Sequence, residues 1–146
     1  MSAVPDRVRE VMQAVSSLHV LATVDAKGKP WMRWMGAIAE SPDHPWTFYI
    51  ACFKGSRKMA QIAANPNAQL LFTKQESWEV ATLSGTAEAV DTPEARQLLW
   101  EGCPPMRQYY SGVDDPSMGI IKFTTCCLEL LAMQEGHETH HFALEG

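Results

Sequence analysis

The segment Trp46–Pro66, WTFYIACFKGSRKMAQIAANP, constrains the fold of this chain more than any other stretch. Its first part, Trp46–Cys52, is rich in aromatic and apolar residues and predicts a buried strand. A short turn follows, and Ser56 is a suitable N-cap for a helix that we expect to end near Ala64, because the residue before a proline is disfavoured in helical geometry. The pattern therefore predicts a strand that runs directly into a helix.

The first turn of this expected helix carries two cations, Arg57 and Lys58, beside the Ser56 hydroxyl. The first N–H groups of a helix have no partner within it, and the helix dipole is positive at that end. Cations at this end oppose the dipole, which suggests that they face a bound anion such as a phosphate. The alternative is that both are solvated surface cations that flank an ordinary N-cap.

A third cation, Arg33, lies in the middle of Pro30–Ala39, a run of large apolar residues that predicts another strand. Alternation along a strand places Arg33 on the same face as Met35. A charge among such neighbours is costly to bury unless it is paired. Because a guanidinium can bind two phosphate oxygens at once, we favour an anion site shared with the helix start. A solvated Arg33, or one paired with Glu40 or Glu79, is the alternative.

The remaining pattern predicts a mainly β chain in one domain, residues 1–146, with short turns between most strands. Two further helices are expected, one from Asp6 to about Leu18 and one capped by Thr92. The other expected strands are the hairpin of His19–Asp25 with Pro30–Ala39, then Ala68–Thr73, Trp78–Val90 with a bend at Gly85, and Ile120–Met133. The polar tail, residues 134–146, is left uncertain. About six strands joined in this way favour an antiparallel barrel with peripheral helices over a parallel doubly wound sheet.

Bulk properties exclude several classes of protein. The net charge of −5 argues against general nucleic-acid binding, and no apolar run is long enough to span a membrane. The N-terminal residues lack the basic and apolar layout of a signal peptide. The four cysteines include no C-x-x-C pair, so we expect reduced thiols in a cytoplasmic protein, with the adjacent Cys126 and Cys127 on opposite faces of a strand.

Four stretches in the same order resemble the pyridoxamine 5'-phosphate oxidase-like flavoproteins, the FMN-binding split barrels, and among them the general stress protein branch. LATVDAKGKPWMRWMGA is similar to the opening hairpin and its arginine-bearing strand. TFYIACFKGSRKMAQIAANPNAQLLF is similar to the strand, the Ser-Arg-Lys helix and the next strand. VATLSGTAEAVDTPEARQLLW and YYSGVDDPSMGIIKF are similar to the later strands and loop. The resemblance covers nearly the whole chain.

The resemblance implies a six-stranded antiparallel split β-barrel that forms a homodimer, with one FMN at each end of the interface. It implies that Arg33 contacts the phosphate and that three residues of the helix start, Ser56, Arg57 and Lys58, hold the phosphate and the ribityl chain. It implies that the isoalloxazine ring lies against Met35, Ile50 and Ala51. Candidates for reaching the flavin from the partner chain are Trp78, Glu79 and Trp100.

The chain also departs from the oxidase itself. Nothing after Met133 matches the C-terminal Arg-x-His segment that binds pyridoxamine there, so the substrate stays open. We expect an FMN-dependent oxidoreductase that acts on a small-molecule substrate or reductant, with the redox chemistry supplied by the flavin. The alternatives are a non-catalytic flavin-binding stress-response module, or a binder of heme or a deazaflavin coenzyme in the same groove.

Three histidines near the C-terminus, His137, His140 and His141, form an H-x-x-H-H cluster. On a helix they could share one face and bind a divalent metal. The segment is polar and terminal and lacks a carboxylate of the H-E-x-x-H kind, which favours a loose tail or a partner contact. No metal site is therefore expected.

Overall fold

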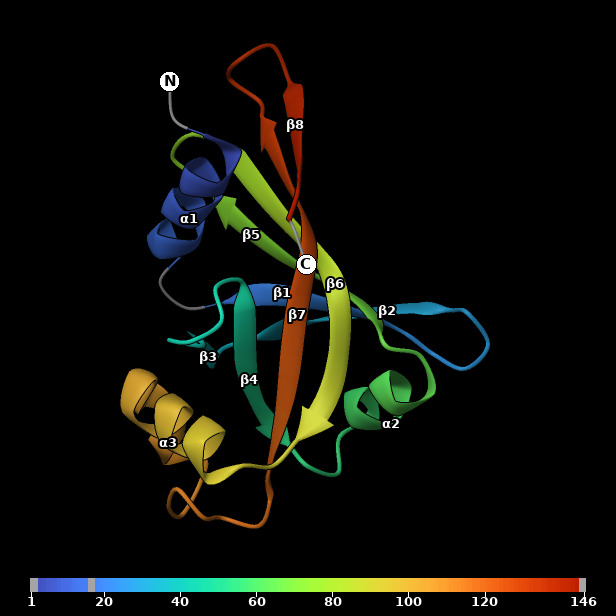
Figure 1. Cartoon of the computed structure of the whole chain (residues 1–146), viewed down its shortest axis with the longest axis vertical. Helices are drawn as coiled ribbons and strands as arrows, with labels where there is room; N and C mark the ends of the chain where they lie inside the picture. The colour runs from blue at the N-terminus through green and yellow to red at the C-terminus, as the bar shows by residue number, and fades with distance from the viewer. Residues whose placement is uncertain (1–2, 16–17, 145–146) are drawn as a thin grey trace.

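The computed structural model describes residues 3–15 and 18–144 and shows a strongly curled antiparallel sheet with helices around its outside (Figure 1). The strands are β1 (His19–Val24), β2 (Pro30–Met35), β3 (Ile38–Glu40), β4 (Thr47–Phe53), β5 (Asn67–Lys74), β6 (Glu79–Val90), β7 (Met118–Ala132) and β8 (Glu138–Ala143). The helices are α1 (Val4–Ala14), α2 (Arg57–Ala64), α3 (Pro93–Gly102) and the 3-10 helix η1 (Pro104–Gln108).

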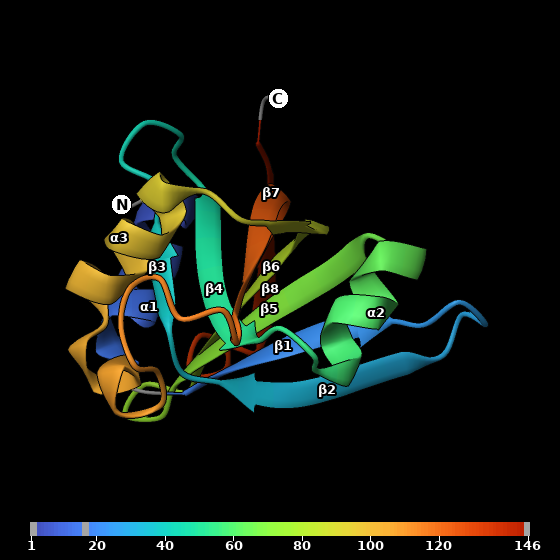
Figure 2. The same ribbon diagram turned by 90° about the horizontal axis from the view of Figure 1, so that it is seen from below.

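The order of strands explains why the sheet curls. Hydrogen-bonded neighbours follow the order β2-β1-β5-β6-β7-β4-β3. The strand β8 pairs with the last part of β7, beyond the part that pairs with β4. The two edge strands, β2 and β3, are consecutive in the chain and are separated only by Gly36 and Ala37, so the sheet must bend until its edges meet (Figure 2). Because β2 pairs with β1 while β3 pairs with β4, the barrel is closed by two residues of chain and not by a ladder of hydrogen bonds.

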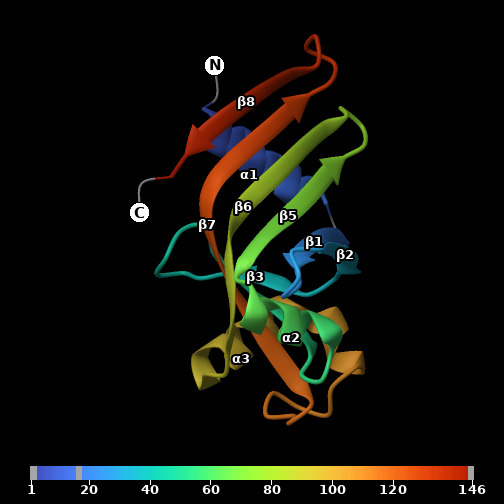
Figure 3. The same cartoon turned by 90° about the vertical axis from the view of Figure 1, so that its right-hand side faces the viewer.

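This arrangement confirms the predicted mainly β, antiparallel class and corrects the strand count. The expected strand Pro30–Ala39 is two strands, because its halves pair with different partners. The tail that the sequence left uncertain contains β8, which pairs with β7 from Cys127 to Ala132. The described chain therefore has eight strands where six were expected. Figure 3 shows β8, β7, β6 and β5 side by side, with α1 behind them.

The N-terminal helix is shorter than predicted. It begins at Val4, with Pro5 in the first turn where its fixed φ is favourable, so Asp6 lies inside the helix and is not its cap. It ends at Ala14, because Val15 already has extended backbone. The part of the expected helix at residues 16–17 lies outside the described residues. The predicted apolar stripe does cover the sheet, with Val8 and Val11 fully buried.

A β-bulge lies at the predicted bend in the strand that contains Gly85. Gly85 pairs with Thr125 and Ser84 pairs with Cys127, so Cys126 is an extra residue in β7 with no partner in β6. Only glycine fits here, since a Cβ on Gly85 would lie 2.0 Å from the carbonyl oxygen of Thr124. The bulge also overturns the expectation that Cys126 and Cys127 point to opposite faces, because their sulfurs are 3.4 Å apart.

We expect Gly85→Ala to lower the free energy of unfolding by about 2 kcal/mol, because the new methyl group meets backbone that a side-chain rotation cannot move away. Urea unfolding of the two proteins measures the difference. Gly36→Ala is the matched control, since a Cβ at Gly36 would meet nothing within 4 Å. Equal losses in the two variants would show that the bulge does not need the glycine.

Candidate functional site

A pocket of about 780 Å³ opens beside α2, where β2 and β4 approach α3 and η1. This volume is typical of a site for a cofactor or a small molecule. Its wall is mainly apolar, and Lys58 is the only ordinarily charged side chain among the described residues that line it. The lining residues are Met12, Val15, Leu18, His19, Trp34, Met35, Gly36, Ala37, Ile38, Ala51, Cys52, Phe53, Lys58, Phe72, Gly102, Cys103, Pro105, Met106, Gln108, Tyr109 and Tyr110.

The Arg33 side chain joins β2 to α2. Its Nη1 donates to Thr23 Oγ1 at 2.8 Å and to the carbonyl oxygen of Leu21 at 3.2 Å, and its Nη2 donates to Gln61 Oε1 at 2.8 Å. The Thr23 hydroxyl also donates to the Gln61 oxygen at 2.6 Å. These contacts fix the guanidinium against the helix, but all of its partners are neutral. The positive charge of Arg33 is therefore held in place without being neutralised.

The two carboxylates considered as partners for Arg33 are used elsewhere. Glu40 forms a pair with Arg9 at 2.7 Å, and Glu79 lies 3.2 Å from Arg7. No ion pair to Arg33 forms within the described part of the chain. Burial lowers the pKa of Arg33, and the positive charge of Arg57 lowers it further. Two guanidinium groups thus repel each other at the start of α2, which is the electrostatic condition that a bound anion would relieve.

Ser56 occupies the N-cap position of α2, as predicted, but its side chain makes no capping bond. The Ser56 oxygen is buried and has no hydrogen-bond partner, although the Cys52 thiol lies close by. A buried hydroxyl that makes no hydrogen bond is destabilising, and the Cys52 thiol is the group within reach of this one. The Ser56 side chain therefore leaves the first N–H groups of α2 uncapped, at the same end of the helix as Arg57 and Lys58.

The two basic residues that follow Ser56 make different contacts. Lys58 faces the pocket. The Arg57 guanidinium lies 4.8 Å from the centroid of the Trp31 ring, so the tryptophan supports it from β2. Arg33 and Arg57 are therefore close enough for their charges to interact. Ser56 and Lys58 lie near Cys52, which lines the pocket.

The three residues expected beside the isoalloxazine ring do not all face the pocket, because neighbouring residues of a strand point to opposite faces. Met35 and Ala51 line the pocket. Ile50, the neighbour of Ala51 in β4, points to the opposite face and is fully buried in the core. Only its backbone could contribute to the pocket.

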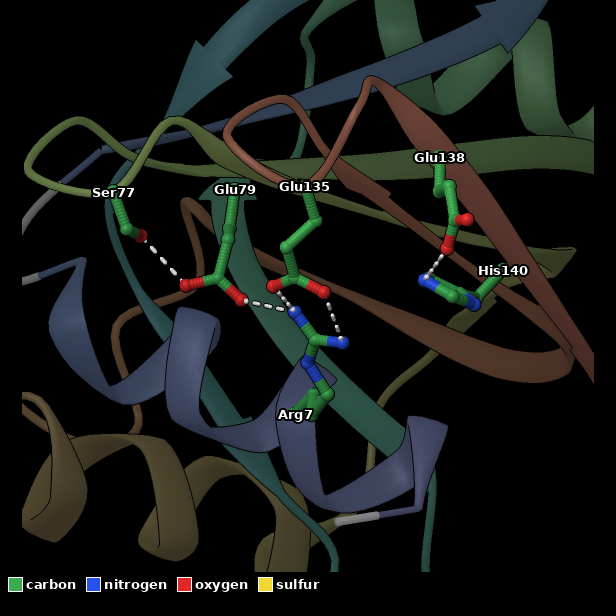
Figure 4. Close-up of polar contacts among 6 residues, drawn as sticks. All are labelled: Arg7, Ser77, Glu79, Glu135, Glu138 and His140. Atoms are coloured by element: carbon green, nitrogen blue, oxygen red, sulfur yellow. Dashed lines mark hydrogen bonds and ion pairs between the residues drawn. The ribbon is translucent and has the colours of Figure 1, made fainter. Parts of the chain in front are cut away.

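The three residues expected to act across an interface lie apart from the anion-binding residues of their own chain. Glu79 begins β6 at the far end from α2 and is held by Ser77 and Arg7, as Figure 4 shows. Trp78 precedes it in the turn and is half exposed. Trp100 belongs to α3 and is partly buried against the smaller apolar cluster, with the Arg107 guanidinium 5.3 Å from the centroid of its ring. None of the three lines the pocket.

His19 is a pocket residue that sequence reasoning missed. It is 3% exposed, stacks on Phe72 with 5.1 Å between ring centroids, and its Nε2 has no partner. Burial lowers the pKa of His19 to about 4, so the imidazole is neutral at pH 7. The signal was present in the sequence, because alternation along β1 puts His19 on the same face as the buried Leu21 and Thr23. Cys52 and Cys103 also line the pocket, and burial raises the pKa of each thiol.

The C-terminal histidines do not form a metal site in the structure. His140 and His141 are consecutive residues of β8 and therefore point to opposite faces, with glutamates 3.5 Å and 3.9 Å away (Figure 4 for His140). Across residues 3–15 and 18–144, no group of three or more His, Cys, Asp or Glu side chains could hold a metal ion.

Comparison with known proteins places this geometry in a family. The family model described as pyridoxamine 5'-phosphate oxidase matches residues 4–126. A search of curated proteins gives no match. A protein related to general stress protein 26 from Clostridium acetobutylicum has a TM-score of 0.78 at 20% identity, over 95% of this chain and 93% of that one.

Two further solved structures share the fold. An FMN-binding protein related to pyridoxamine 5'-phosphate oxidase, from Nostoc punctiforme, has a TM-score of 0.66 at 15% identity, over 100% of both chains. A heme-binding protein from Mycobacterium smegmatis has a TM-score of 0.76 at 14% identity, over 98% of this chain and 59% of that one. At such identities the likeness concerns the split-barrel fold alone, whereas the family match covers most of the sequence. The chain therefore belongs to the pyridoxamine 5'-phosphate oxidase family.

Proposed function

We propose that this protein is an FMN-binding oxidoreductase whose flavin lies in the pocket with its phosphate at the start of α2. The observation that carries the proposal is the approach of Arg33 and Arg57 to each other with no carboxylate among the described residues to neutralise them. A phosphate monoester offers the two negative charges and the acceptor oxygens that this arrangement lacks.

The residues present fit a phosphate-bearing planar cofactor. Arg33, Arg57 and Lys58 supply positive charge, and the Ser56 hydroxyl, which has no internal partner, supplies a donor. The pocket that Lys58 enters is mainly apolar, as a ring system requires, and Met35 and Ala51 form part of its wall. A bound flavin would supply hydride or electron exchange. The protein's own residues then bind, orient and shield it from water.

The absence of acidic side chains from the described lining bears on the substrate. Beside Lys58, the titratable lining groups are the neutral His19, two cysteines and two tyrosines. A cationic amine such as that of pyridoxamine would find no carboxylate there. We therefore favour a neutral or anionic, largely apolar substrate or reductant over vitamin B6 oxidation.

A homodimer completes this proposal. Met32 and Trp34 on β2 are 74% and 72% exposed, and Trp34 is also at the pocket rim. Large apolar side chains grouped beside a pocket are typical of an interface. Trp78, Glu79 and Trp100 could then reach a flavin only from the second copy.

The free state of all four cysteines fits a cytoplasmic location. No helix in the described part of the chain combines the length and the apolar character needed to cross a membrane.

The test compares FMN with riboflavin, which carries the same ring and ribityl chain but no phosphate. Because each hydrogen bond between charged groups contributes about 1.5–3 kcal/mol, FMN should bind at least about 10-fold more tightly than riboflavin. Fluorescence titration of freshly purified protein measures both affinities. Equal affinities, or a failure to bind FMN, would contradict the proposal.

Steady-state assays with NAD(P)H and common acceptors separate an enzyme from a flavin-binding module. A flavin that binds with the expected preference but is never reduced and reoxidised would support the module.

Heme is a second candidate ligand because His19 places a neutral imidazole in the pocket wall, and neutral imidazole is a common iron ligand. The absorption spectrum of the purified protein distinguishes heme from flavin directly.

A further inference from the structure

Cys126 and Cys127 form a close pair of thiols outside the pocket. Neighbouring residues in a regular strand point to opposite faces, but the bulge at Cys126 turns both side chains to the same side. The Cys126 thiol donates to the Cys127 sulfur with 3.4 Å between the two atoms. Both residues are exposed, and neither is in a disulfide.

The backbone around this pair is held on both sides of the bulge. The N–H of Thr125 donates to the carbonyl oxygen of Trp46 at 3.1 Å, which ties the strand to the start of β4. The N–H of Leu144 donates to the carbonyl oxygen of Cys126 at 2.9 Å, just beyond the end of β8. The two sulfurs are therefore presented by a braced strand and not by a loop, so little ordering is needed when they bind a common centre.

We propose that Cys126 and Cys127 form a bidentate site for a thiophilic centre of the trivalent organoarsenical class. In a tetrahedral zinc site with Zn–S bonds near 2.3 Å, two sulfurs are about 3.8 Å apart. Pyramidal trivalent arsenic holds its sulfur ligands at a narrower angle, which suits the shorter 3.4 Å separation found here. A centre bound linearly by two sulfurs would need them further apart.

The number of ligands supports the same class. No third His, Cys, Asp or Glu among the described residues completes a metal site with this pair. A structural zinc would need four ligands, whereas an organoarsenical brings its own carbon substituent and needs only two sulfurs. The open, exposed position of the pair leaves room for that substituent.

The binding step is a condensation. An arsonous acid, R–As(OH)₂, reacts with the two thiols, so that two As–S bonds form, two As–O bonds and two S–H bonds break, and two water molecules leave. Arsenic stays trivalent, and no electron acceptor is needed. The second As–S bond closes within one molecule, which gives the pair a large advantage over separate thiols.

Phenylarsine oxide is the probe, with intact-protein mass spectrometry as the readout. We expect one phenylarsenic group per chain, retained in excess 2-mercaptoethanol and removed by the dithiol 2,3-dimercaptopropanol. Cys126→Ser and Cys127→Ser should each weaken binding at least about 100-fold, because the intramolecular second bond is lost. The Cys52→Ser/Cys103→Ser double variant removes the other two thiols and should keep the adduct.

Thermal unfolding of each variant checks the fold. Because Cys126 and Cys127 are exposed, we expect Cys126→Ser and Cys127→Ser to leave the melting temperature unchanged. Three results would overturn the site: an adduct that survives in Cys126→Ser, an adduct that 2-mercaptoethanol removes, or reduced protein whose two thiols join to each other or to a second copy before the probe reacts. The site is independent of the flavin, so these results leave the proposed function unaffected.

Discussion

Replacing Arg33 and Lys58 together by methionine should weaken FMN binding at least about 100-fold and leave riboflavin binding nearly unchanged. Methionine keeps most of the side-chain length and removes the charge, together with the hydrogen bonds that Arg33 donates to Leu21, Thr23 and Gln61. Each substitution deletes a cation from the proposed phosphate site, where Arg33 lies among neutral partners and Lys58 lines the pocket. The expected result is therefore a loss of the preference for FMN over riboflavin, because only FMN carries the phosphate.

The control for this experiment is Lys74→Met. Lys74 lies at the end of β5, roughly 23 Å along the strand from Asn67, which follows α2 almost directly. The Lys74→Met substitution removes the same kind of charge at a residue outside the proposed phosphate site, so FMN affinity should be unchanged. The Thr23–Gln61 hydrogen bond remains when Arg33 is replaced, and a melting curve verifies that the double variant is folded. Undiminished FMN affinity in that variant would refute the phosphate site.

The second large effect that we expect is a loss of stability at acidic pH. Between about pH 6.5 and pH 4 the protein should lose roughly 3 kcal/mol of unfolding free energy because of His19 alone. The pKa of His19 is about 4 in the folded state, since the buried imidazole resists protonation. In the unfolded chain it takes up a proton near pH 6.5. As the pH falls through this window the unfolded state binds a proton that the native state does not, so the native state becomes less favoured.

His19→Phe should flatten this part of the pH profile, because phenylalanine can still stack on Phe72 but does not titrate. Urea unfolding at pH 7, 5.5 and 4.5 measures the slope for both proteins. His44→Gln is the matched control, since His44 is exposed in a loop and its removal should leave the slope as it is. If the His19→Phe protein kept the slope of the original, another group would be responsible.

A separate acid effect is expected at lower pH from the loop before β7. The Asp115 carboxylate accepts hydrogen bonds from the N–H and hydroxyl groups of both Ser111 and Ser117, at 2.7–3.1 Å. These bonds hold the pKa of Asp115 far below its usual range. Their contribution is present above the ordinary pKa of an aspartate and is lost only as the pH falls below about 4. It therefore does not overlap the His19 window.

Local patterns in the sequence were sufficient where a single segment determines its own structure. The run from Trp46 to Pro66 forms the predicted strand and helix, and Thr92 caps α3 by accepting from the N–H of Ala95 at 3.2 Å. Gly85 marks the predicted bend because a close backbone contact excludes any side chain. The charge argument also singled out Arg33 and Arg57, whose guanidinium groups do lie near each other, because an unpaired guanidinium in an apolar strand is unusual in any fold.

The features that sequence reasoning missed depend on contacts between distant segments. Thr23 and Gln61 hold Arg33, but they are 38 residues apart and meet only when β1 packs against α2. The polar composition of residues 138–143 does not predict a strand, and β8 forms because an edge of β7 is available to it. In the same way, the meeting of the Cys126 and Cys127 sulfurs is a consequence of Gly85 on the neighbouring strand.

The pairing of β7 has a consequence for how the protein avoids aggregation. One side of β7 is covered by β6 along its length, and the other side is shared between β4, up to Thr124, and β8, from Cys127. Without β8, the stretch Cys127–Ala132 of this long strand would expose unsatisfied N–H and C=O groups, which is the kind of edge that recruits other chains. The C-terminal hairpin, charged at Glu135 and Glu138, thus serves as a guard against intermolecular strand addition.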